Sequence, residues 1–393
     1  MNNKKTILFI FLALLMVFSG FMNTVKKVSA KEISNQIEIK SQSSILIDAD
    51  SKTIISKNNE LEHLPIASMC KIMTLLIVFE KIDNNELFIN EKIVVSDNAS
   101  GMGGSQIFLE SGGEYEVDQL IKGIVVASAN DACVALAERL CGSEENFVNV
   151  MNQKCKDLSM DNTVFVNCTG LPKEGQYSCA KDVSTMFSEL IKHEKYFDYS
   201  TIWMDTIKHP KDRITEISNT NKLIKFYEGC EGGKTGYTKE AGHCLCAVAK
   251  RDNLRLISVV IHAPDSKTRF NDVSNMFNYG FNNYCNKTIL DKNKEISLNS
   301  IIKGGRQLLT KAYPERTIKA FSRKNQKNSY EIIINEHKDL KAPIKIGDVV
   351  GNVQIFENGI EVACVNLLSK ENIAKKTYFD NLKECIDNWN LVG

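Results

Sequence analysis

The sequence predicts an α/β (α+β) protein: a domain with an antiparallel sheet flanked by helices, then a small all-β C-terminal domain and an amphipathic tail helix. Three observations support this fold class. Two long apolar, β-branched runs flank a polar turn within residues 243–262, and buried helical patterns occur over residues 65–79 and about 117–140. Short alternating runs replace both patterns after about residue 285. With 393 residues, 43% hydrophobic and 25% charged, the composition is that of a globular chain.

The first thirty residues have the pattern of a signal peptide. Lys4 and Lys5 precede an apolar stretch over residues 7–18, and small residues follow up to Ala30. We expect cleavage after Ala30 and export. The alternative is an uncleaved membrane anchor, but the apolar stretch is shorter than the ~20 residues that a spanning helix needs.

The charge balance and the cysteine and histidine patterns argue against a nucleic-acid-binding protein, a disulfide-rich small domain and a metalloprotein. The 49 Lys and Arg nearly balance 48 Asp and Glu, so no basic surface for nucleic acid is expected. Twelve Cys in an exported chain suggest disulfides, yet disulfide frameworks belong to small domains without a large core. We therefore expect mostly buried thiols. The six His are dispersed and no metal-binding spacing occurs, so neither a metal nor another cofactor is predicted.

The elements of the first domain follow in chain order. Residues 44–57 hold two β-branched runs around a polar turn, which predicts a hairpin. Pro65 suits the start of a helix, and apolar residues recur after it at helical spacing up to Phe79. The remaining predicted elements are helices over about 117–128 and 131–140, a hairpin over 243–262 and a helix over 269–284.

The C-terminal third has the alternating pattern of strands. The predicted strands include Ile296–Leu298, Tyr330–Ile334, Val349–Phe356 and Ile360–Leu367, and Glu357-Asn358-Gly359 is a hairpin signal. In the tail, one helical stripe carries Tyr378, Phe379, Leu382, Cys385, Ile386 and Trp389. The predicted division is a signal peptide over 1–30, a catalytic-type domain over 31–288, a β-rich domain over 289–370 and the helical tail over 371–393.

The first chemically suggestive element is Ser68-Met69-Cys70-Lys71, at the start of the first buried helix. Residues at i and i+3 share one helix face, so the hydroxyl and the amine can meet. A Ser hydroxyl needs a base to become a nucleophile, and Lys is a base only when its pKa is lowered by burial or a nearby cation. Alone, this spacing recurs by chance and is weak evidence.

Two further elements follow at a distance. Ser128-Ala129-Asn130 lies between two apolar helical runs. A purely structural role, the end of one helix followed by the N-cap of the next, would also explain these residues. Lys234-Thr235-Gly236 precedes a strand and offers a cation and a hydroxyl for a carboxylate, while Gly allows close approach of a backbone. Separately, each of these elements is common.

Together, in this order and spacing, the three elements resemble the signature of class A β-lactamases and penicillin-binding proteins. Ser-Ala-Asn in the middle makes the chain most similar to the low-molecular-weight serine D-Ala-D-Ala carboxypeptidases, the peptidase S11 family. The resemblance also covers Pro65-Ile66-Ala67-Ser68, Asn167-Cys168-Thr169-Gly170-Leu171, Gly233 to Thr238, and Lys341 to Asp348. It implies a serine β-lactamase/transpeptidase-like fold for the first domain.

The resemblance also implies roles for individual residues. Ser68 would attack the carbonyl between two terminal D-alanines, Lys71 would accept its proton, and Ser128 would relay a proton to the leaving amine. The implied substrate-binding residues are Asn130, Lys234, Thr235, Gly236 and Arg269, and the implied oxyanion hole is formed by the backbone N–H groups of Ser68 and Tyr237. The implied partners are peptidoglycan pentapeptide stems, β-lactams as covalent inhibitors, and the outer face of the cytoplasmic membrane, reached through the tail helix. The alternative for the tail is docking on the β-rich domain.

Three alternatives remain open at this point. Cys70 is nucleophilic in principle, but on a helix it points about 200° from Ser68. A β-lactamase needs a Glu for deacylation, and the closest string, Glu145 to Asn149, comes too soon after Ser128. A non-catalytic wall-binding protein would not need the complete set of catalytic side chains.

Overall fold

The computed structural model describes residues 37–326 and 328–390. The predicted signal peptide, residues 1–30, lies outside this part of the chain. The described helices and strands all lie between Ser43 and Asn390.

A five-stranded antiparallel sheet organises the first part of the described chain, in the order β2-β1-β9-β8-β7. Its strands are β1 (Ser43–Asp48), β2 (Ile54–Asn58), β7 (Cys230–Thr238), β8 (Gly242–Arg251) and β9 (Leu254–Ala263). Most residues of the central strands β8 and β9 are buried because helices cover both faces of the sheet. Both predicted hairpins, over 44–57 and 243–262, are therefore present.

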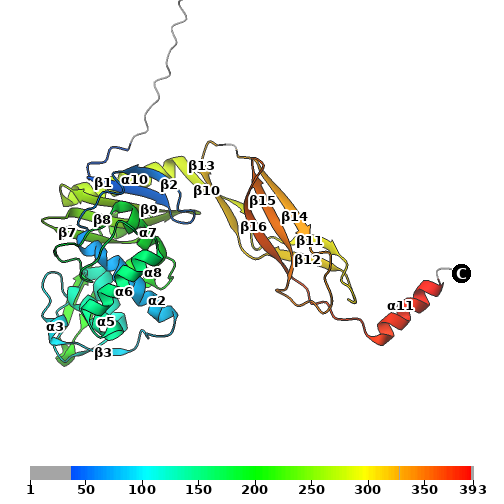
Figure 1. Ribbon diagram of the computed structural model, residues 1–393, viewed down its shortest axis with the longest axis horizontal. Helices are drawn as coiled ribbons and strands as arrows, with labels where there is room; N and C mark the ends of the chain where they lie inside the picture. Colours follow the sequence, from blue (N-terminus) through cyan, green and yellow to red (C-terminus); the bar gives the residue numbers. More distant parts are fainter. Residues whose placement is uncertain (1–36, 327, 391–393) are drawn as a thin grey trace, which may run out of the picture. The chain divides into compact units, whose positions relative to one another are not determined.

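Helix α10 (Ser266–Asn283) packs on one face of the sheet, and α7 (Ala180–Leu190) packs on the other with α2 (Lys71–Asp83) behind it (Figure 1). A Cβ at Gly280 of α10 would come within 2.4 Å of the Leu256 side chain, so this glycine allows α10 to lie close to the sheet. The main hydrophobic core lies between the sheet and the helices on the α7 side.

The remaining elements of this part complete the domain around the core, and some of them contact strand β7. The helices are α3 (Asp97–Ser100), α4 (Val117–Lys122), α5 (Asn130–Cys141), α6 (Glu144–Asp157), α8 (Tyr196–Ser200) and α9 (Leu223–Phe226). Two antiparallel strand pairs accompany them, β3 (Lys92–Val94) with β4 (Glu114–Glu116) and β5 (Met204–Lys208) with β6 (Ile214–Ser218). Three tighter or wider helical turns are also present, namely η1 (Ala67–Cys70), η2 (Gly123–Ala127) and η3 (Pro210–Asp212).

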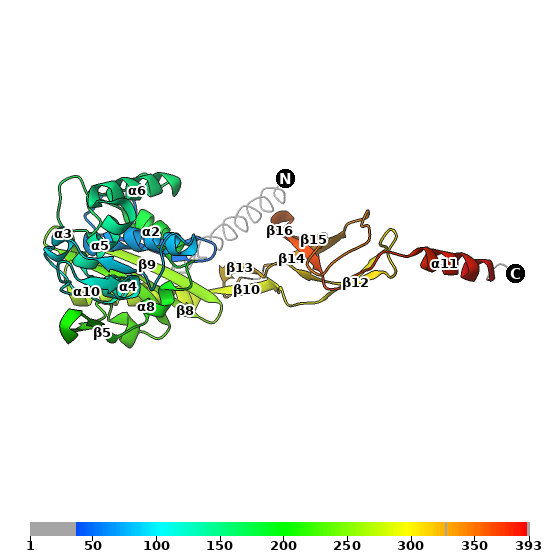
Figure 2. The same ribbon diagram turned by 90° about the horizontal axis from the view of Figure 1, so that it is seen from below.

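The C-terminal part up to Ser369 is all β, as predicted (Figure 2). It has a hydrophobic core of its own. Its five-stranded sheet has the order β11-β12-β16-β15-β14, and β10 pairs with β13. The strands are β10 (Tyr284–Leu290), β11 (Ile296–Ser300), β12 (Leu309–Pro314), β13 (Ile318–Arg323), β14 (Tyr330–Glu336), β15 (Val349–Glu357) and β16 (Ile360–Ser369). Asn358 and Gly359, both at positive φ, form the turn between β15 and β16 that the sequence signals.

The tail forms α11 (Tyr378–Asn390), and large apolar side chains on it are exposed. Tyr378, Phe379 and Trp389 are 75%, 77% and 83% exposed. Within residues 37–326 and 328–390, no helix combines the length and apolar character required to cross a bilayer.

Two local predictions need correction. Pro65 does not open the first helix: helical structure begins at Ala67 with the tight turn η1, and α2 starts at Lys71. The helix predicted over 117–128 is α-helical only to Lys122, because the last turn, η2, widens to a π-helix. The strands β10, β12 and β13 were not among those predicted.

Candidate active site

Ser68 and Lys71 meet where the tight turn η1 passes into helix α2. The Nζ atom of Lys71 lies 2.9 Å from the Oγ atom of Ser68. Lys71 is fully buried, and its Nζ also donates to the carbonyl oxygen of Thr169 at 2.5 Å. Burial lowers the pKa of Lys71, since the charged amine loses its hydration. A neutral amine held against a hydroxyl is the arrangement that general-base activation of a serine requires.

Ser128 and Lys234 form a second pair of a hydroxyl and an amine. Ser128 ends the π-turn η2 in the left-handed region, at φ 64°, and Lys234 lies on β7. The Nζ atom of Lys234 donates to the Oγ atom of Ser128 at 2.8 Å. Burial lowers the pKa of Lys234, and the charge of Lys71 lowers it further. Protonation of one amine therefore disfavours protonation of the other.

Asn130 offers an acceptor that the protein does not use. Its Nδ2 donates to the carbonyl oxygen of Gly103 at 2.6 Å, and its backbone N–H donates to the carbonyl oxygen of Ser105 at 2.7 Å. The side chain is only 3% exposed, yet its Oδ1 has no hydrogen-bond partner among residues 37–326 and 328–390. A buried carbonyl oxygen without a partner is costly, so this atom is suited to accept an N–H from a bound ligand.

Strand β7 lies directly against the turn that carries Ser68. A Cβ at Gly236 would come within 2.6 Å of the carbonyl oxygen of Ile66 and 3.2 Å of the backbone nitrogen of Ser68. Gly170 approaches from another side, where a Cβ would come within 2.0 Å of the Ala67 carbonyl oxygen. Ala67 itself has φ 47°, a strained value for a residue with a side chain. The nucleophile's turn is therefore held in an unusual conformation by two close backbone contacts.

Thr235 lies on strand β7, and Arg269 contacts this strand from helix α10. The Oγ1 of Thr235 donates to the Oγ1 of Thr220 at 2.8 Å. Arg269, in the first turn of α10, donates from Nη1 to the carbonyl oxygen of Gly236 at 3.0 Å, and its buried Nε has no hydrogen-bond partner in the described part of the chain. Its guanidinium thus contacts the backbone of β7, beside the predicted carboxylate-binding residues.

Tyr237 presents two different groups. Its backbone belongs to β7 next to Gly236, while its side chain is 60% exposed and stacks on His243 with ring centroids 4.4 Å apart.

These contacts bring all the predicted site residues to one region around β7, η1 and the start of α5.

Thr169 and Asn167 contribute to the site in a way that sequence reasoning did not identify. Asn167 Oδ1 accepts from the backbone N–H of Gly170 at 2.7 Å and of Thr169 at 3.2 Å. This fixes the loop whose Thr169 carbonyl oxygen contacts Lys71. The sequence offered two signals for this loop: the family resemblance of Asn167 to Leu171, and the presence of Asn and Gly, which are typical of tight turns.

The thiol of Cys70 does not point into this region. It is completely buried and donates to the carbonyl oxygen of Asn167 at 3.2 Å. Burial raises the pKa of Cys70 far above its ordinary value, which leaves the thiol protonated and unreactive. All twelve cysteines are free. Within residues 37–326 and 328–390, no cluster of His, Cys, Asp or Glu is arranged to hold a metal ion.

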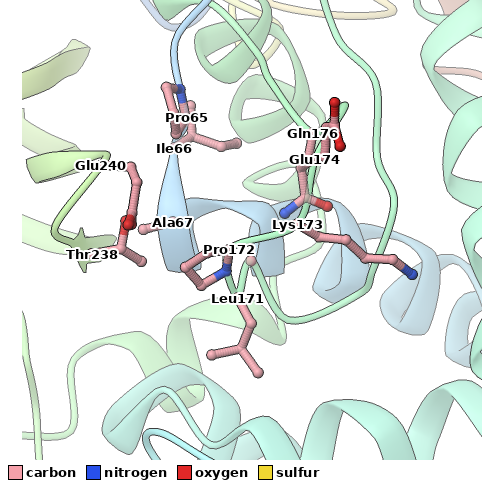
Figure 3. A pocket seen from close by; sticks show the side chains of 11 residues that line it. Pro65, Ile66, Ala67, Leu171, Pro172, Lys173, Glu174, Gln176, Thr238 and Glu240 are labelled. Carbon is pink, nitrogen blue, oxygen red and sulfur yellow. The ribbon is translucent and has the colours of Figure 1, made fainter.

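A cavity of about 370 Å³ lies beside the nucleophile's turn (Figure 3). Residues 65–67 form part of its lining, together with residues 170–174, Gln176, Thr238 and Glu240. The lining therefore combines the segment before Ser68, the loop that contacts Lys71, and the end of strand β7.

This fold with a buried Ser–Lys pair defines the class of penicillin-binding serine hydrolases. Residues 27–265 match the profile of the D-alanyl-D-alanine carboxypeptidase family, and residues 284–375 match that of the penicillin-binding protein 5 C-terminal domain. The chain belongs to the D-alanyl-D-alanine carboxypeptidase family.

Individual relatives agree with this assignment. The chain is 36% identical over 357 residues to D-alanyl-D-alanine carboxypeptidase DacF of Bacillus subtilis, covering 91% of this chain and 92% of the relative. It is 31% identical over 350 residues to DacC of Escherichia coli, covering 85% and 84%. Among solved structures, penicillin binding protein 5 from Haemophilus influenzae superposes with a TM-score of 0.66 at 28% identity, covering 86% of this chain and 98% of that chain.

Proposed function

We propose that this enzyme removes the terminal D-alanine from peptidoglycan pentapeptide stems through an acyl-enzyme on Ser68. The observation that carries the proposal is the 2.9 Å approach of the buried Lys71 amine to the Ser68 hydroxyl. The family supplies the reaction, and the geometry around Ser68 supports the assignment of roles.

Acylation proceeds in two steps. The Ser68 oxygen forms a bond to the carbonyl carbon between the two D-alanines, and its proton passes to the neutral amine of Lys71. The carbonyl oxygen becomes an oxyanion that accepts hydrogen bonds from the backbone N–H groups of Ser68 and Tyr237. The C–N bond then breaks as Ser128 relays to the leaving D-alanine amine the proton that Lys71 took from Ser68, which leaves the peptide as an ester of Ser68 and Lys71 neutral again.

The terminal carboxylate of the substrate is recognised along β7. Lys234 supplies a cation, Thr235 a hydroxyl, and Arg269 a guanidinium in contact with Gly236. A carboxylate beside Lys234 favours the charged form of that amine, and this charge in turn favours a neutral Lys71. Asn130 accepts the substrate amide N–H through its unpartnered Oδ1. Water then attacks the ester carbonyl, the C–O bond to Ser68 breaks as the Ser68 oxygen takes up a proton from the water, and the shortened peptide leaves with a new C-terminal carboxyl group.

One experiment separates this reaction from its rivals. We expect mass spectrometry after penicillin treatment to find a long-lived adduct on Ser68, and a synthetic pentapeptide to lose D-alanine. Rapid hydrolysis of penicillin without a persistent adduct would favour a β-lactamase. Peptide binding without release of D-alanine would favour a non-catalytic wall-binding protein.

We also propose export, with cleavage after Ala30, and a division into domains over residues 31–288 and 289–370. Separate hydrophobic clusters on either side of residue 289 support the division.

For the tail over residues 371–393 we propose association with the outer face of the membrane, supported by the exposed apolar side chains of α11. Cosedimentation with vesicles of anionic and neutral lipid, with and without residues 375–393, tests it. Equal, weak binding of both forms contradicts it.

A further inference from the structure

The order of groups along β7 sets the direction in which a substrate lies. Lys234 and Thr235, which receive the terminal carboxylate in the proposed function, come first, and the oxyanion donor Tyr237 comes next. The part of the peptide before the scissile bond must therefore continue past Thr238, the last residue of β7, toward Glu240. The cavity of Figure 3 begins at these two residues.

The walls of the cavity are partly apolar. Thr238 and Glu240 lie on one side, Leu171 and Pro172 lie across from them, and Ala67 lies between (Figure 3). An extended peptide advances ~3.3 Å per residue, so the residue before the D-Ala-D-Ala pair reaches this cavity while the scissile carbonyl is at Ser68. A volume of about 370 Å³ accommodates a long aliphatic side chain.

The charged groups of the lining favour a cation. Two carboxylates, Glu174 and Glu240, line the cavity, and neither has an ion pair or hydrogen bond in the described part of the chain. The single lysine of the lining, Lys173, directs its Nζ away from the cavity centre (Figure 3), to 3.5 Å from the carbonyl oxygen of Val166. The cavity therefore combines apolar walls with carboxylates that are not neutralised by the protein.

We propose that this cavity is a specificity subsite for the diamino acid that precedes D-Ala-D-Ala in the stem. The aliphatic part of its side chain packs against Leu171 and Pro172, and its terminal ammonium faces Glu240, with Glu174 as the second carboxylate. The inference rests on the proposed function, because it takes the direction of the substrate from the roles of Lys234 and Tyr237. The shared recognition chemistry, an ammonium on an aliphatic chain, is present in both lysine and diaminopimelic acid.

The test compares synthetic acyl-X-D-Ala-D-Ala peptides in which X is lysine, ε-N-acetyl-lysine, norleucine or diaminopimelic acid. Release of D-alanine is measured for the wild type, Glu240→Gln, Glu174→Gln and the double variant. Glu228→Gln is the matched control, because it removes the same charge just before β7 instead of just after it. The lysine and diaminopimelic acid peptides establish which of the two diamino acids the subsite prefers.

We expect Glu240→Gln to lower kcat/KM for the peptides with a free amine by about threefold to fivefold, since an exposed ion pair contributes little more. The double variant should lower it further, and high salt should reduce the difference. The norleucine and acetyl-lysine peptides, and the Glu228→Gln variant, should be unaffected. Penicillin acylation of Ser68 should be unchanged in every variant, which shows that the variants are folded.

The outcomes separate the two proposals. If no peptide releases D-alanine and penicillin does not acylate Ser68, the proposed function fails. If D-alanine is released but Glu240→Gln and the double variant leave the ratio of lysine to norleucine peptides unchanged, the function stands and the subsite is overturned.

Discussion

The Nζ atom of Lys234 lies 2.8 Å from the Oγ atom of Ser128, although 106 residues separate the two in the chain. The contact joins the residue proposed to hold the substrate carboxylate to the residue proposed to protonate the leaving group. Binding of the carboxylate and departure of D-alanine are thereby linked through one hydrogen bond.

Replacing the cation of this pair should weaken recognition of the carboxylate. We expect Lys234→Gln to lower kcat/KM for a pentapeptide by about 10- to 100-fold, since hydrogen bonds to charged groups contribute roughly 1.5–3 kcal/mol. The matched control is the same peptide with a C-terminal amide, a poor substrate on which Lys234→Gln should have much less effect. An equal loss on both peptides would contradict a role in binding the carboxylate.

The nucleophile can be assigned by comparing two neighbouring residues. Ser68→Ala should abolish the penicillin adduct, whereas Cys70→Ala should retain it, because the Cys70 thiol is buried against the Asn167 carbonyl. Intact-mass spectrometry after penicillin treatment makes the comparison, and circular dichroism confirms that both variants are folded. An adduct that persists in Ser68→Ala and disappears in Cys70→Ala would reverse the assignment.

Acylation should depend on pH through Lys71. The amine acts as a base only when it is unprotonated, and burial lowers its pKa below the ordinary lysine value. The acylation rate should therefore fall as the pH is lowered through this pKa and level off above it. Stopped-flow measurement with a chromogenic penicillin gives the profile.

A variant with a permanent charge provides the control for this profile. Lys71→Arg should lose about 10²–10⁴-fold in acylation at every pH, because a guanidinium does not lose its proton. A wild-type rate that does not change with pH, or an active Lys71→Arg variant, would exclude Lys71 as the base.

The close contact at Gly236 should be sensitive to a single methyl group. Gly236→Ala places a Cβ within 2.6 Å of the Ile66 carbonyl oxygen, so β7 and the Ser68 turn must move apart. We expect at least about a tenfold loss in acylation rate, since a displacement of ~1 Å can cost about 100-fold in a positioned reaction. Thermal unfolding of the variant shows whether stability changes as well. Normal acylation would mean that this contact does not position the nucleophile.

The sequence predicted the parts of the structure that depend on local pattern. The long apolar strands β8 and β9 and the Asn358-Gly359 turn follow from residue type alone. The site residues could be named because Ser68, Ser128 and Lys234 stand in a recognisable order. The strands β12 and β13 were missed because they are short and mix lysines with apolar residues, so that their conformation depends on pairing with distant partners.

The local conformation of the site could not be predicted in the same way. The positive φ of Ala67 arises from packing against Gly170 and Gly236, which lie more than a hundred residues further along the chain. The wide turn η2 and the role of the Thr169 carbonyl also depend on tertiary contacts. A sequence pattern identifies side chains, whereas these features belong to the backbone.

The turn at Ala67, which is held by close contacts with Gly170 and Gly236, also affects how the enzyme loses activity when it is heated. An alanine such as Ala67 does not favour the left-handed conformation by itself. Partial unfolding of the segment around Gly170 or around Gly236 therefore releases the strain at Ala67 and misaligns the Ser68 hydroxyl. Catalytic competence is then a property of the whole cooperative core, and β-lactam labelling becomes a sensitive reporter of its integrity.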